Sequence, residues 1–126
     1  MNDKFTVDDC RVMPLPRHER PNGNITVVEN NKELPFDVRR VYYLYDVPAG
    51  EERGGHAHRK LYQFLVAASG SFDVLIDDGT QRRTVFLNRP DKGLLIVPGI
   101  WRELNNFSSG AVCLVLASEF YDESDY

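Results

Sequence analysis

Residues 50–70, GEERGGHAHRKLYQFLVAASG, carry the strongest structural signal in the chain. His56 and His58 stand two positions apart between Gly50 and Gly70, and Gln63 follows five positions after His58. Successive residues of a strand face opposite sides, so the two imidazoles are expected to point the same way. Two histidines on one strand face indicate a functional site inside a β-barrel. A bound metal ion is the first hypothesis that such a pair suggests.

The bulk composition bounds the class of protein. With 126 residues the chain is long enough for one hydrophobic core and too short for two ordinary domains, so we expect a single domain over 1–126. A net charge of -4 gives no general attraction to nucleic acid or membranes, and any anion site must be local. The longest apolar run, Ala111 to Ala117, is far shorter than the roughly 20 residues of a membrane span. Without a signal-peptide pattern, a cytoplasmic location is expected.

Cys10 and Cys113 are expected to be free structural thiols.

Short β-rich runs separated by turns fill most of the chain and predict an all-β sandwich or barrel. An Asp78-Gly79 pair between two of them predicts a hairpin, because such a pair readily adopts the positive φ of a tight turn. The expected strands are Ile25 to Glu29, Val38 to Val47, Tyr62 to Ser69, Ser71 to Asp77, Arg82 to Leu87, Gly93 to Val97, Trp101 to Asn105 and Ala111 to Glu119.

The two ends of the chain differ from this pattern. Pro14, Pro16 and Pro21 limit ladder pairing in residues 1–22, which are expected to form an edge strand or an arm. The acidic tail 121–126 has no apolar face, and we expect a solvated end.

The spacing of glycines, histidines and Gln63 in 50–70 resembles the first motif of the cupin superfamily, and GLLIVPGIWRELNN, residues 93–106, resembles the second. This resemblance implies a cupin-type double-stranded β-helix, a jelly-roll barrel. In metal-binding cupins the positions of Gln63 and Arg102 usually hold a glutamate and a histidine ligand. A guanidinium is permanently protonated and offers no lone pair, so half of the ligand set is lost. We therefore expect no metal and no other cofactor.

Without a metal, a histidine remains suited to proton transfer, because both of its protonation states are accessible near neutral pH. His56 and His58 are expected to lie next to a strand that carries Arg40 and Tyr42 on one face. The alternative interpretation makes both histidines hydrogen-bonded core residues.

Four segments in the right order, among them RRVYYLYD, RGGHAH and LASEFYDESDY, resemble the dTDP-sugar 3,4-ketoisomerases, the WxcM-like cupins of deoxysugar biosynthesis. The resemblance implies conversion of a dTDP-linked 4-keto-6-deoxyhexose to its 3-keto isomer through an enediol. It implies that His56 moves the proton between carbons, that Tyr42 serves the oxygens and that His58 assists. A homodimer with an exchanged N-terminal strand is also implied.

The expected binding residues surround these groups. Arg40 and Arg53 suit the diphosphate, since guanidinium forks match phosphate oxygens. Gln63 is expected to hydrogen-bond the sugar or a histidine, Trp101 to stack on thymine, and Arg102 to make the pocket more cationic.

Two other functions stay open at this point. One is a non-catalytic nucleotide-sugar-binding cupin, and the other is a dTDP-sugar 3,5-epimerase relative. Asn22 also departs from the family pattern, which has an arginine there, so Arg20 would have to replace it if that arginine binds phosphate.

Overall fold

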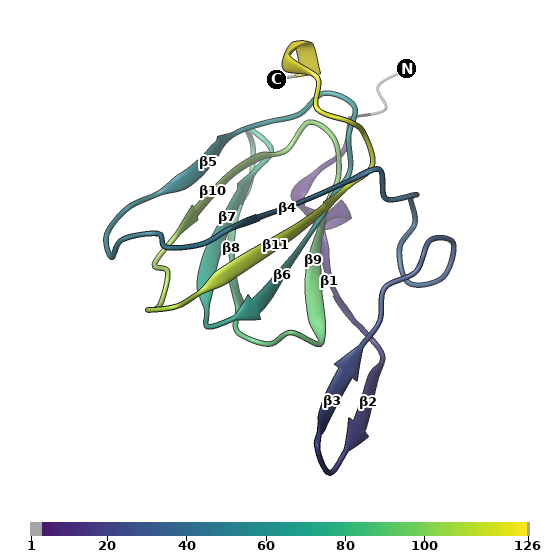
Figure 1. Ribbon diagram of the computed structural model, residues 1–126. Helices are drawn as coiled ribbons and strands as arrows, with labels where there is room; N and C mark the ends of the chain where they lie inside the picture. The colour runs from purple at the N-terminus through teal and green to yellow at the C-terminus, as the bar shows by residue number, and fades with distance from the viewer. Residues whose placement is uncertain (1–3, 126) are drawn as a thin grey trace.

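Two antiparallel sheets face each other in the computed structural model, which describes residues 4–125 (Figure 1). The larger sheet has the strand order β1 (Arg11–Pro14), β9 (Lys92–Ile96), β6 (Gln63–Ser69), β11 (Val112–Ala117) and β4 (Arg40–Leu44). The smaller has the order β5 (Arg53–His56), β10 (Trp101–Asn105), β7 (Phe72–Asp77) and β8 (Arg82–Leu87). The all-β, cupin-type jelly-roll prediction is confirmed.

The core lies between the two sheets because the inward residues of their strands are apolar. Phe72, Val74 and Ile76 alternate along β7 and are fully buried, whereas their neighbours are half-buried. In β6, residues 63–67 are all buried, so both faces of this strand are covered. Leu34 belongs to the same buried cluster, and Phe36 packs against it. Both cysteines are buried and free, as expected.

The predicted hairpin at Asp78-Gly79 is confirmed. Gly79 has φ 91°, and Asp78 Oδ1 accepts hydrogen bonds from the backbone N–H groups of Thr80 and Gln81. Asp78 Oδ2 accepts a further bond of 2.9 Å from the backbone N–H of Val7, in the 3-10 turn η1 (Val7–Asp9). One aspartate therefore joins the turn to the N-terminal segment.

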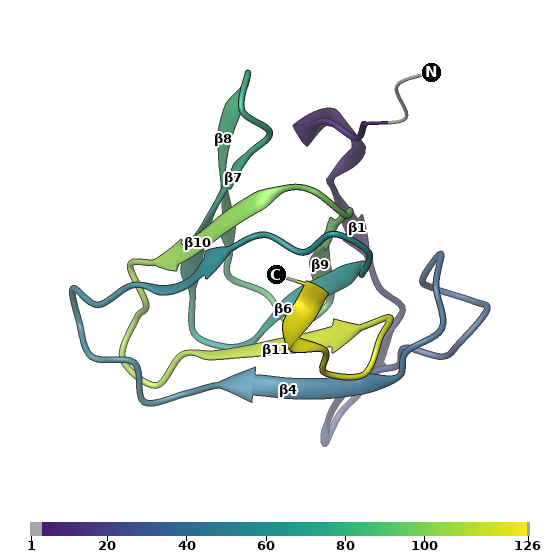
Figure 2. The ribbon, with the colours of Figure 1, turned by 90° about the horizontal axis from the view of Figure 1, so that it is seen from above.

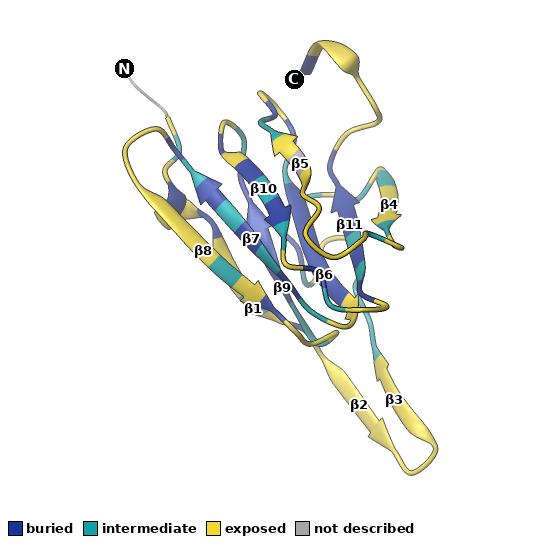
Figure 3. Ribbon diagram, turned by 90° about the vertical axis from the view of Figure 1, so that its left-hand side faces the viewer, coloured by how far each residue is buried: buried dark blue, intermediate teal, exposed yellow. Residues whose placement is uncertain are grey.

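The N-terminal segment contains both an edge strand and an arm. β1 pairs with β9 at the edge of the larger sheet and ends at Pro14, a position where a missing N–H costs little. Among the strands that the structure describes, β2 (Arg17–Arg20) and β3 (Gly23–Thr26) pair only with each other, and they project beyond the barrel (Figure 1). The hairpin they form is exposed almost throughout (Figure 3).

The prediction of a solvated C-terminal tail was wrong for Asp125. The tail forms a 3-10 turn, η2 (Glu123–Asp125), over one end of the barrel (Figure 2), where Asp125 is buried. Charge patterning alone missed this, because the carboxylate is held by backbone N–H groups from a distant segment. Among the helical turns within 4–125, none is long and apolar enough to cross a membrane.

Candidate active site

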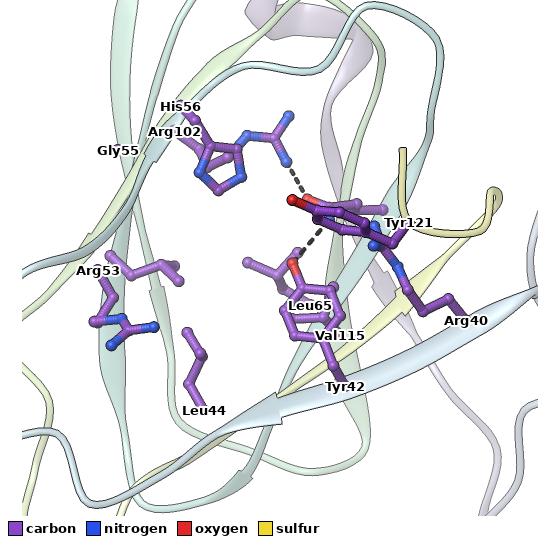
Figure 4. A pocket seen from close by; sticks show the side chains of 12 residues that line it. Arg40, Tyr42, Leu44, Arg53, Gly55, His56, Leu65, Arg102, Val115 and Tyr121 are labelled. Carbon is purple, nitrogen blue, oxygen red and sulfur yellow. Dashed lines mark hydrogen bonds between the residues drawn. The ribbon is translucent and has the colours of Figure 1, made fainter. Parts of the chain in front are cut away.

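A cavity of about 530 Å³ lies between the two sheets (Figure 4). Six of the eight predicted site residues line it, whereas His58 and Trp101 do not. The lining is formed by Arg40, Tyr42, Leu44, Arg53, Gly55, His56, Gln63, Leu65, Arg102, Leu104, Val115 and Tyr121.

Opposite sheets supply the two sides of the cavity. Arg40 and Tyr42 alternate along β4 of the larger sheet, whereas His56 ends β5 of the smaller sheet. The expectation that these strands are neighbours was wrong, because β4 pairs with β11 and β5 pairs with β10. Tyr42 and His56 therefore face the cavity from opposite walls (Figure 4).

A chain of hydrogen bonds crosses the back of the cavity. Arg102, which is buried, donates through Nη1 to Gln63 Oε1, and Gln63 Nε2 donates to the Tyr42 hydroxyl over 2.9 Å (Figure 4). Arg102 also donates to the carbonyl of Ile100 through Nε and Nη2. Gln63 was expected to bind the sugar or a histidine, and here it links the arginine to the tyrosine. Because the Tyr42 oxygen accepts from Gln63, its own proton can be donated to a ligand.

Burial and the charge of Arg102 favour the neutral form of both histidines. Burial lowers the pKa of His56, and the Arg102 charge lowers it further. Burial, with Arg102 and His56 as smaller causes, lowers the pKa of His58 to about 4. A neutral imidazole on the cavity wall is available to accept a proton at neutral pH. Burial raises the pKa of Tyr42, which therefore keeps its proton.

Sequence reasoning missed Tyr121 as a cavity residue. The Arg40 guanidinium lies 5.4 Å from the ring centre of Tyr42 and 5.6 Å from that of Tyr121. Tyr121 belongs to the motif LASEFYDESDY, which carried the family resemblance, but its acidic neighbours suggested solvent. The aromatic rings hold Arg40 at the cavity edge.

Trp101, which was expected to stack on thymine, is not among the residues that line the cavity. Arg102 and Leu104 point inward from β10, so Trp101 and Glu103 take the outer face by alternation. The indole Nε1 donates to Glu103 Oε1 over 3.0 Å.

The charges of the cavity suit an anion. Arg40, Arg53 and Arg102 line it, and the lining residues that the structure describes include no carboxylate. Nowhere within 4–125 do three His, Cys, Asp or Glu side chains gather as a metal site would require. In a chain of net charge -4, the positive charge is therefore concentrated where a phosphate group could bind.

Comparison with known proteins places this geometry in a family. Residues 8–126 match the family model described as FdtA, WxcM-like, C-terminal. The TDP-4-oxo-6-deoxy-alpha-D-glucose-3,4-oxoisomerase of Aneurinibacillus thermoaerophilus is 46% identical over 104 residues, which cover 82% of this chain and 75% of that protein.

Two solved structures share the fold closely. The WlaRB TDP-quinovose 3,4-ketoisomerase of Campylobacter jejuni is 46% identical with a TM-score of 0.90, covering 94% of this chain and 91% of that one. A variant of the 3,4-ketoisomerase QdtA from Thermoanaerobacterium thermosaccharolyticum, in complex with TDP-4-keto-6-deoxyglucose, is 35% identical with a TM-score of 0.90. That match covers 99% of this chain and 87% of the other.

Proposed function

Because this chain belongs to the FdtA family of WxcM-like proteins, we propose that it is a TDP-sugar 3,4-ketoisomerase. Its substrate is a TDP-linked 4-keto-6-deoxyhexose and its product the 3-keto isomer. The observation that carries the proposal is the placement of His56 and Tyr42 on facing walls of one arginine-lined cavity. A binding module would need the arginines, but not a neutral imidazole opposite a phenol.

In the proposed reaction His56 moves a proton between carbons. The ketone at C4 acidifies the hydrogen at C3, and the neutral imidazole removes it. The electrons of the broken C–H bond form a C3–C4 double bond, and those of the C4 carbonyl move to its oxygen. The imidazolium then returns its proton to C4 as the C3 carbonyl forms.

Tyr42 transfers the protons at the two sugar oxygens. Its hydroxyl donates a proton to the C4 oxygen as charge develops there, and the phenolate takes the proton of the C3 hydroxyl. Gln63 supports the phenolate oxygen by donating to it, and Arg102 polarises Gln63. The net change is one proton moved from C3 to C4 and one moved from the C3 oxygen to the C4 oxygen.

The diphosphate is the part of the substrate that the arginines fit. Arg53 and Arg40 line different parts of the cavity (Figure 4), and Nε of Arg40 is buried without a hydrogen-bond partner among the described residues 4–125. A buried donor of this kind favours a ligand that supplies an acceptor. Phosphate oxygens meet this need and match guanidinium geometry.

The decisive experiment is incubation with TDP-4-keto-6-deoxyglucose in deuterated buffer, followed by NMR, with and without a chelator. We expect isomerisation with deuterium uptake in both samples. An absence of both isomerisation and exchange at C3 and C4 would contradict the isomerase, and would favour a nucleotide-sugar-binding module. Loss of turnover with the chelator would contradict the metal-free mechanism. Uptake at C5 would instead support the 3,5-epimerase alternative.

A matched pair of histidine variants tests the base. His56→Asn should lower turnover by at least about 100-fold, since a general base contributes about 10²- to 10⁴-fold, and TDP binding should change little. His18→Asn changes an exposed histidine of β2 and should retain turnover. Full turnover by His56→Asn would show that another group removes the proton.

We also propose that the chain forms a homodimer. The β2–β3 hairpin projects from the barrel with exposed side chains, including Ile25. A free-standing two-stranded hairpin is marginally stable in water, and burial against a second copy would stabilise it. The exposed outer face of β4 offers an apolar surface for the same contact.

A further inference from the structure

The C-terminal turn η2 is bound to the segment that follows β5. Asp125 Oδ1 accepts hydrogen bonds from the backbone N–H groups of Arg59 and Lys60, over 3.1 and 2.8 Å. The Arg59 N–H also donates to the Asp125 carbonyl over 2.9 Å. Residues 65 positions apart in the chain are thus held together, and Asp125 is only 3% exposed.

The second carboxylate oxygen of Asp125 faces His58. Its Oδ2 lies 3.3 Å from His58 Nδ1, and the His58 side chain is 1% exposed. A buried carboxylate oxygen needs a donor, and Nδ1 is the polar atom placed to supply one. A neutral His58 that donates to this oxygen carries its proton on Nδ1, and its Nε2 keeps a lone pair.

His58 in turn packs against His56. The two rings lie 4.6 Å apart between centroids with an interplanar angle of 88°. The His58 carbonyl accepts a bond of 2.7 Å from the Gly99 N–H, which holds the backbone at this point. Since His56 lines the cavity and His58 does not, His58 reaches a substrate only through His56.

We propose that Asp125 is a positioning residue: its carboxylate fixes the ring orientation and the Nδ1–H tautomer of His58, and His58 holds the His56 imidazole at the cavity wall. The proposal rests on the isomerase function above. It assigns a role in the reaction to the acidic C-terminal turn, whose Asp125 is not among the residues that line the cavity.

The variant Asp125→Asn tests whether the Asp125 carboxylate sets the tautomer of His58. The asparagine amide oxygen can still accept from the Arg59 and Lys60 N–H groups, but its NH₂ group would face His58 Nδ1 as a donor. Because Nδ1 must then accept, Asp125→Asn should convert His58 to the Nε2–H tautomer. Glu123→Gln removes an exposed charge from the same turn and serves as the matched control.

The measurement is ¹⁵N NMR of the intact protein labelled at histidine. The chain has three histidines, so assignment by His→Asn variants is direct, and exposed His18 is an internal reference. We expect the Nδ1–H pattern for His58 in the wild type and in Glu123→Gln, and the Nε2–H pattern in Asp125→Asn. An Nε2–H pattern for His58 in the wild type would overturn the proposal, even if no variant folds.

Kinetics then separate positioning from binding. In Asp125→Asn we expect kcat to fall about 10- to 100-fold, by analogy with the loss when the partner of a metal-bound histidine is removed, with KM changed less than about threefold. Glu123→Gln should keep both constants. Unchanged kcat in a folded Asp125→Asn protein would overturn the proposal. If the wild type itself fails to isomerise the sugar, the proposed function fails, whereas the tautomer result still tests the contact.

Discussion

A histidine that is buried in its neutral form makes the folded state sensitive to acid. The pKa of His58 is lowered to about 4, whereas an unfolded histidine titrates near 6.5. The unfolded chain therefore binds a proton first as the pH falls. The stabilisation is complete above about pH 6.5 and is lost on the way to about pH 4, by about 1.4 kcal/mol per pH unit for one proton.

Urea unfolding at several pH values between 7 and 4 measures this loss. His58→Gln removes the titrating group, so its free energy of unfolding should depend less steeply on pH than that of the wild type. The control His18→Gln, at an exposed position of β2, should keep the wild-type slope. Equal slopes in all three proteins would show that the pKa of His58 is the same in the folded and unfolded states.

Gln63 gives a second test at a single residue. In Gln63→Glu the introduced carboxylate can accept from Arg102, but it cannot donate to Tyr42, whose hydroxyl would turn toward it. We expect kcat to fall about 100-fold, in the range of lost acid catalysis, with a smaller change in TDP affinity. Gln81→Glu, at an exposed turn position, is the control. Calorimetry with TDP and NMR turnover assays measure both quantities.

At the scale of elements, β9 shows how closely the strands pack. A Cβ on Gly93 would lie 2.4 Å from the Phe64 ring and 2.8 Å from the Leu65 carbonyl oxygen, closer than real atoms approach. Gly93→Ala should therefore destabilise the protein by about 1–3 kcal/mol, as overpacking does. In Gly55→Ala the nearest atom to the added Cβ would be a Trp101 ring carbon at 3.5 Å, an ordinary contact distance. The melting temperature should therefore fall much less than in Gly93→Ala. Equal shifts in melting temperature would contradict this packing.

The elements that could be predicted are those with one buried face. Alternation and turn residues placed Arg82–Leu87 and Trp101–Asn105 at the observed boundaries. The predicted strand over 38–47 is shorter in the structure, where β4 ends at Leu44, and Asp46 has φ 56°. β5 lacked a periodic signal because two of its four residues are glycines. The C-terminal turn depends on long-range contacts that no local pattern encodes.

The site at the scale of the whole molecule was predicted by motif more than by periodicity. His56 and Gln63 came from one stretch and Arg102 from another, and the barrel brings all three to one cavity. The sequence did not show that β4 and β5 lie in opposite sheets, because pairing partners depend on the complete topology. Trp101 lies on the outer face of β10, because inward Arg102 puts its neighbour outside.

The outer face of the larger sheet gives the last prediction, the oligomeric state. Val41 and Tyr43 are 54% and 58% exposed there, opposite Leu116 and Leu114 in the ladder. A hollow of about 300 Å³ is lined by Leu114 and Leu116, by Val66 and Ala68 of β6, and by residues of the N-terminal segment and of the segment 89–91. Exposed apolar surface of this kind marks a protein interface, and a second copy carrying the same face would cover it by two-fold symmetry.

Light scattering should give the mass of a dimer for the wild type. Tyr43→Lys should shift the equilibrium toward monomer, because a desolvated ammonium without a partner opposes association. Phe86→Lys changes an equally exposed aromatic residue, 56% exposed, on β8 of the other sheet, and should leave the dimer intact. A wild-type monomer would refute the dimer, and dissociation by Phe86→Lys alone would move the interface to the smaller sheet.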